Sequence, residues 1–150
     1  MLTTLIENKV VEVLTDATIN DVDTHVVKGI EKWLKPFEEY TDFPRVVLSC
    51  ENIELDSTEI QGVTKDYLVN IFVLCYNRDG DDVLDDRDIV AERIEDSLRS
   101  NQRLGNLADN NKEKVYSSEI GTVRLVKFGS EGAYYAIAWI EYLVHVERSI

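Results

Sequence analysis

Two segments of this 150-residue chain are apolar at both odd and even positions, and this feature limits the possible folds most. They are Tyr67 to Tyr76, interrupted by Asn70, and Ala133 to Val146, where the odd positions turn polar from Glu141. Successive side chains of a strand point to opposite faces of its sheet. A strand that is apolar on both sides needs cover on both faces, and edge strands avoid this pattern. We therefore expect both segments to be central strands that pair with each other.

The other periodic segments complete an α+β plan. Helical spacing of apolar residues predicts three helices, over residues 2–13, 22–37 and 82–100. Two more strands are expected over residues 44–50 and 115–128, and Gly129 to Gly132 is a suitable hairpin connection to the last strand. The order predicts one domain, residues 1–150, with a mostly antiparallel four-stranded (or slightly larger) sheet and about three helices packed on one face.

Such helices cover only one face of the sheet, and little chain remains for the other. We therefore expect a surface outside the protomer to cover the second face. Candidate contacts are Ile89, which lies off the apolar side of its predicted helix, and the strand residues Lys65, Arg124 and Lys127. These cations are either solvated residues that protect strand edges or ion-pair partners for a neighbouring copy, and the sequence favours neither reading.

The charge of the chain argues against one class of function. Sixteen Lys and Arg stand against 29 Asp and Glu, a formal net charge of −13. Proteins that grip nucleic acid through its phosphates need clustered cations.

The longest apolar run, Ala133 to Ile140, is far below the ~20 residues of a membrane helix. The first residues lack the pattern of a signal peptide, so we expect a cytoplasmic origin and no membrane.

No motif in the sequence specifies an enzyme. Cys50 and Cys75 lie in apolar, strand-like surroundings, which favours buried free thiols over a disulfide. The acidic run Asn77 to Asp88 fails the calcium-loop template, and helix capping explains its composition. His25 and His145 have no nucleophile pattern nearby, and no phosphate-binding glycine loop is present. We expect no catalytic residues, no metal and no cofactor.

Several local motifs, in this order of elements, resemble the tail terminator proteins of long-tailed bacteriophages, the minor tail protein U-like group. Phe43-Pro-Arg-Val-Val-Leu48 is similar to the Phe-Pro start of the family's first strand. The polar excursion Glu51 to Glu59, leading into Tyr67 to Leu74, is similar to the family's loop and second strand. Asn101 to Asp109 contains a Leu-Gly-x-Leu segment that also occurs in phage connector proteins, and the aromatic-rich stretch Ala133 to Val146 fits the closing hairpin.

The resemblance implies a structural virion protein without catalytic residues. Members of this family form a hexameric ring on the finished tail tube, end its polymerisation and present a surface to the head-tail connector or neck proteins. The ring is assembled in the host cytoplasm and lies at the tail-neck junction. DNA would pass through its lumen without specific binding. The polar segment from Glu51 to Lys65 is then the expected contact with tube or neck, through Glu54, Asp56, Glu59 and Lys65.

Two other functions remain open at this point. One is a head-tail connector or neck protein of the same particle, because such proteins share the quoted motifs. The other is a small cytosolic domain that binds a divalent metal or another ligand through the acidic turn Asp79 to Asp88.

Overall fold

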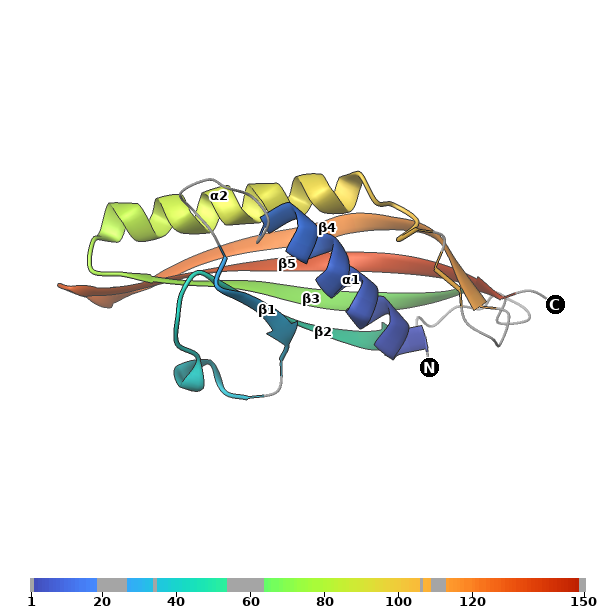
Figure 1. Cartoon of the computed structure of the whole chain (residues 1–150), viewed down its shortest axis with the longest axis horizontal. Coiled ribbons are helices and arrows are strands. Elements are labelled where there is room, and N and C mark those ends of the chain that lie inside the picture. Colours follow the sequence, from blue (N-terminus) through green and yellow to red (C-terminus); the bar gives the residue numbers. More distant parts are fainter. Residues whose placement is uncertain are drawn as a thin grey trace.

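The computed structural model describes residues 2–18, 27–33, 35–53, 64–105, 107–108 and 113–148. Over these residues the chain is α+β, as predicted, with two α-helices, one short 3-10 helix and five strands (Figure 1). In chain order the elements are α1 (Leu2–Thr18), β1 (Gly29–Lys32), η1 (Phe37–Glu39), β2 (Arg45–Ile53), β3 (Thr64–Asn77), α2 (Gly80–Arg99), β4 (Glu113–Ser130) and β5 (Ala133–Arg148).

The sheet differs from the prediction in strand number and orientation. Its five strands are ordered β1-β2-β3-β5-β4. β1 runs parallel to β2, whereas β2 with β3, β3 with β5 and β5 with β4 are antiparallel, so the sheet is mixed. The two segments with apolar residues on both sides became β3 and β5. They pair with each other inside the sheet, as their pattern predicted.

The helix predicted over residues 22–37 is wrong for the part that the structure describes, and this error accounts for both the missing helix and the extra strand. Gly29–Lys32 forms β1, which adds to β2 in parallel, with Ile30 in register with Val46. Glycine disfavours a helix interior by about 1 kcal/mol relative to alanine. β-branched residues such as Ile30 suit a strand at least as well as a helix. Pairing with β2 then decides the local structure.

Both α-helices pack on the same face of the sheet and build the main core. α1 lies against β1 and β2, whereas α2 lies against β3, β5 and β4. Ile6 and Val10 of α1, and Val90 and Ile94 of α2, are fully buried there. Among the described residues, no helix combines the length and the apolar character that crossing a bilayer requires.

The start of α2 follows from its capping residue. The carboxylate of Asp79 accepts hydrogen bonds from the backbone N–H groups of Asp81 at 2.8 Å and Asp82 at 3.1 Å. These bonds satisfy two of the donors that every helix leaves unpaired in its first turn. The carboxylates of Asp81 and Asp82 also face the positive end of the helix dipole. The interpretation of the acidic run as helix capping is therefore confirmed, but the cap is Asp79, before Gly80, whereas the sequence placed an aspartate cap after Gly80.

A tight turn joins β4 to β5, and a glycine beside it, Gly129 of β4, cannot be replaced without movement. Ser130 is in register with Ala133, so Glu131 and Gly132 alone form the connection. Gly129 has φ +115°, and a Cβ there would collide with the backbone oxygen of Ala133. Gly132 has φ +80°, but a Cβ there would meet nothing within 4 Å.

We expect Gly129→Ala to destabilise the protein more than Gly132→Ala. The latter adds only the cost of a left-handed conformation, about 1 kcal/mol. The former adds a collision with backbone, which brings the loss to about 2 kcal/mol or more. Urea unfolding of both variants measures the difference, and equal losses would contradict the turn geometry.

Candidate interaction surface

The face of the sheet opposite the helices carries a second, smaller core. Val47, Phe72 and Leu74 are buried there beneath Tyr40, with Phe37 and Phe43 packed against them. The rings of Trp33 and Phe37 stack at 4.9 Å between centroids, and both contact Phe72. The expectation that only an outside surface could cover this face is thus corrected. The chain covers the β2–β3 part itself, with the rings of Trp33, Phe37, Tyr40 and Phe43 from the described part of residues 33–43.

The part of the hairpin nearest its turn is not covered in this way. We call residues 124–135 the hairpin arm; Figure 1 shows the paired ends of β4 and β5 reaching past the first turn of α2. Leu125 is 53% exposed, Val126 and Phe128 are each 49% exposed, and Tyr135 is 38% exposed. Leu125 is in register with Ala138, on the helix side, whereas Val126 is in register with Ile137, on the opposite side. The arm therefore exposes apolar side chains on both faces, a feature typical of contact surfaces.

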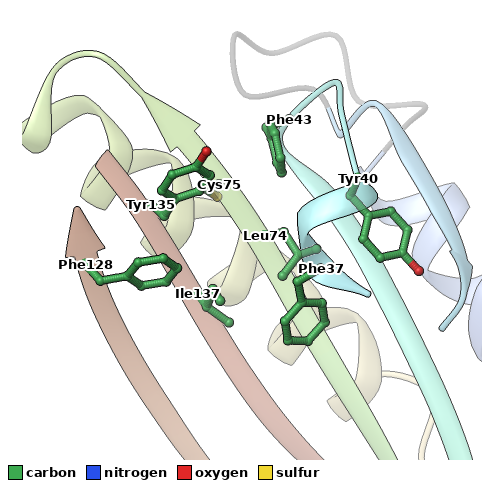
Figure 2. A pocket seen from close by; sticks show the side chains of 8 residues that line it. All are labelled: Phe37, Tyr40, Phe43, Leu74, Cys75, Phe128, Tyr135 and Ile137. Atoms are coloured by element: carbon green, nitrogen blue, oxygen red, sulfur yellow. The ribbon is translucent and has the colours of Figure 1, made fainter. Parts of the chain in front are cut away.

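A pocket of about 330 Å³ lies beside the arm on the face away from the helices (Figure 2). Phe128 and Tyr135, whose rings stack at 5.3 Å, come from the arm, and Phe37 and Phe43 face them across the pocket. The full lining is Phe37, Tyr40, Phe43, Leu74, Cys75, Phe128, Tyr135 and Ile137. Such a lining suits an apolar side chain or group and offers no charge to hold an ion.

The two cations predicted as contacts, Arg124 and Lys127, lie on the arm and are exposed. The guanidinium of Arg124 is 4.5 Å from the ring centre of Trp139 and 3.5 Å from the carboxylate of Glu141. The ammonium of Lys127 is 5.2 Å from the ring centre of Tyr134. Neighbouring rings therefore hold both cations in place on the surface, and ion pairs with another copy remain a prediction.

The other predicted contacts lie elsewhere. Lys65 forms an ion pair with Glu113 at 2.9 Å. Lys65 is in register with Val146, which lies far along β5 from the arm. At a rise of ~3.3 Å per residue, Val146 is roughly 36 Å from Tyr135 along the strand. Glu54, Asp56 and Glu59 fall outside the described residues.

Ile89 is half-buried on α2, and the structure does not group it with the arm cations. Glu95 of α2 lines a pocket together with Ser118 to Val123 of β4, so this flank of the helix faces β4. At 3.6 residues per turn, Ile89 lies about 120° around the helix from Glu95. Ile89 is therefore on the flank away from β4, and its contact with another copy stays a prediction.

The thiols do not offer reactive groups. Both cysteines are free. Burial, reinforced by nearby carboxylates, raises the pKa of the Cys50 and Cys75 thiols to about 12. A thiol of such pKa stays protonated at neutral pH and is a weak nucleophile. Within the described ranges, no three His, Cys, Asp or Glu side chains come together as a possible set of metal ligands.

His145 joins three strands at the end of the sheet opposite the arm. Its Nδ1 is 2.7 Å from a carboxylate oxygen of Asp66 on β3, and its Nε2 is 3.1 Å from one of Glu119 on β4. Burial lowers the pKa of His145, but the hydrogen bonds and negative charges of both carboxylates outweigh burial, so its pKa is raised. The protonated imidazole donates to both carboxylates and links β3 to β4 across β5.

Sequence reasoning missed the apolar residues of the arm and the aromatic cover from residues 33–43. The signal for the arm was present in the sequence. Leu125 at an odd position, and Val126 and Phe128 at even positions, are all apolar in a strand that otherwise becomes polar. The signal for the aromatic cover was hidden by the helical spacing of the same residues. Trp33 and Phe37, four positions apart, fit a helix as well as the pair of stacked rings that they form.

No family model matches this chain, and no curated protein matches its sequence. The arm and the adjacent pocket are lined by apolar and aromatic groups, and no lining residue of that pocket is a base beside a nucleophile. Exposed apolar surfaces of this kind suit contact with another protein.

We expect the stability of the protein to depend on pH through His145. A raised pKa in the folded state means that the added stability is fully present below the unfolded-state pKa of about 6.5 and is lost as pH rises through the folded-state pKa. The difference in unfolding free energy between wild type and His145→Gln should be larger near pH 6 than near pH 9, by up to about 1 kcal/mol. Urea unfolding of both proteins measures it, and His25, present in both, cancels. A difference independent of pH would contradict this role.

Proposed function

We propose that this chain is a structural protein of a bacteriophage particle, a tail terminator. Copies form a hexameric ring that caps the tail tube, ends its polymerisation and provides the surface for joining the head or neck. The proposed partners are a second copy, the tail tube protein and a head-tail connector or neck protein, without catalysis or cofactor.

The apolar hairpin arm is the observation that carries this proposal. Four large apolar side chains are exposed there on both faces of a hairpin, which contact with another chain would cover. The motifs that resemble the terminator family supply the identity of the assembly. In the Leu-Gly-x-Leu segment, Leu104 is fully buried in the main core and Gly105 has φ +68°. This motif thus closes the end of α2 onto the sheet and is consistent with a shared fold.

The charge distribution supports passage of DNA rather than its capture. The net charge is −13, and the exposed side of α2 carries Asp81, Asp85 and Glu92. A ring of such chains repels phosphate, so DNA slides through instead of binding. Arg124 lies over the ring of Trp139 and Lys127 over the ring of Tyr134, so these two cations do not form one phosphate-binding cluster.

We expect the purified protein, mixed with tail tubes, to form a ring at one end of each tube and to stop further polymerisation of tube protein. Electron microscopy of tubes with and without the protein shows the ring, and tube lengths after addition of free tube protein show the block. Binding to a portal-side ring but not to tubes would replace this proposal with the connector function. Binding to neither would refute both.

We expect Val126→Asp to abolish self-association while the chain still folds. Val126 is already half exposed, so a carboxylate there costs the protomer little. If a second copy covers it, an unpaired buried charge costs several kcal/mol, which weakens association by roughly a hundredfold or more. Mass photometry over a concentration series measures assembly, and the melting temperature checks folding. Asn52→Asp, which adds the same charge at an exposed site on β2, is the control; equal effects of both variants would exclude a specific role for the arm.

A further inference from the structure

One charged residue interrupts the buried side of α2. Arg87 is only 8% exposed, and arginine is rarely buried unless its charge has partners. Packing alone does not explain it, because an apolar residue would fill the same place without the cost of burying a charge. The other buried residues of this helix are all apolar: Val83, Val90, Ala91, Ile94 and Leu98.

The partners of Arg87 join α2 to the hairpin arm. Its Nε donates a hydrogen bond to the carboxylate of Asp88 at 2.9 Å, and its Nη1 donates one to the backbone oxygen of Val126 at 3.1 Å. Asp88 is the next residue of the same helix, whereas Val126 lies 39 positions further along the chain, in the β4 half of the arm. The side chain of Arg87 therefore links the buried side of the helix to the proposed contact surface.

The direction of β4 needs such a link, because its pairing with β5 is irregular just before the arm. The register shifts between Ile120 and Val123 and is then continuous from Val123 to Ser130. A bulge bends its strand and changes the direction in which the strand continues. β4 is also the edge strand of the described sheet, with β5 on one side. Arg87 bonds to Val126 shortly after the shift and thereby fixes the direction of the arm.

The first turn of α2 contacts the same part of the hairpin. A Cβ on Gly80 would lie 3.1 Å from Nζ of Lys127 and 3.6 Å from the ring of Tyr134. Arg87 follows about two turns further along the helix. The beginning of α2 is therefore a support along which the β4 half of the arm lies.

We infer that Arg87 positions the hairpin arm for assembly. Its bond to Val126 holds β4 in the orientation in which Val126 and Phe128 are exposed on the face of the pocket. The inference rests on the proposed function, which names the arm as the contact with another copy. An arm that is already held in its bound orientation loses less conformational entropy on contact, so association is stronger.

A purely stabilising role of Arg87 predicts a different outcome. Replacement of a buried charged group by an apolar residue of similar size is often neutral for stability. The two groups that would lose their partner belong to Asp88 and Val126, which are both exposed residues, so water can replace the guanidinium. Loss of the guanidinium should therefore change the arm more than the stability of the fold.

Arg87→Met tests the inference, because methionine is long and apolar but has no donor. Mass photometry over a concentration series measures association, and we expect Arg87→Met to associate at least about tenfold more weakly than wild type. Hydrogen exchange, measured where both proteins are monomeric, should be at least about tenfold faster over residues 124–130. The melting temperature should stay close to that of wild type. Arg87→Lys, which keeps a charged donor, should recover part of the association.

Ile94→Val is the matched control for stability. It removes one methylene from the buried side of the same helix, about two turns beyond Arg87 and further from the arm. We expect it to lower the melting temperature and to associate like wild type.

Each result decides between the two roles. Association of Arg87→Met at wild-type strength, unchanged exchange in the arm, or no recovery in Arg87→Lys overturns the positioning role. The arm then remains the contact surface, which Val126→Asp tests separately. An unfolded Arg87→Met, or an equal loss of association in Ile94→Val, also overturns it, because Arg87 then serves the core. A wild-type chain that stays monomeric alone and on tail tubes overturns the proposed function together with this inference.

Discussion

The pairing of β3 with β5 is the interaction on which the rest of the structure depends. These strands are in continuous register from Thr64 with Glu147 to Asn77 with Tyr134, without a bulge. Because both strands are apolar on both sides, their pairing creates two surfaces that water disfavours. The helices α1 and α2 cover one surface, and residues 33–43 cover part of the other. β2 and β4 add at the two sides of this pair and take their register from it.

The hairpin arm is exposed because the strands are longer than the segments that cover them. β4 and β5 continue beyond the segment that residues 33–43 protect, and on the other face Leu125 lies at an edge that α2 leaves open. The apolar side chains at this position are only about half buried in the isolated chain, so the exposed half of their surface adds nothing to its stability. Their burial becomes favourable only in a contact, at roughly 25 cal/mol per Å² of apolar surface. Apolar surface that the chain itself leaves open on both faces of a hairpin is typical of a contact with another chain.

The sequence alone predicted the parts of this fold that local chemistry decides. The double-sided apolar pattern placed β3 and β5, and glycines marked the hairpin turn. The acidic run predicted a helix capped by an aspartate, although it placed the cap after Gly80 and the structure uses Asp79 before it. The sequence-based prediction failed where contact with a distant segment determines the local structure. β1 is an example, because it is a strand only through its pairing with β2. The same limit applies to the candidate site. Arg124 was correctly placed on a strand, but its position over Trp139 depends on the β4–β5 register, and the distance of Lys65 from the arm depends on the whole sheet.

The acidic balance of the chain also shapes how copies can meet. At a net charge of −13, two copies repel in most orientations, so contacts require places where cations remain available. Several cations are already used within the chain: Lys65 with Glu113, Arg45 with Glu31, and Arg87 with Asp88. Cations left exposed at the sheet edges include Lys28 beside β1, and Lys114, Arg124 and Lys127 on β4. Repulsion thus acts as a selector, because it disfavours every arrangement that does not bring these cations against an acidic surface of the other copy.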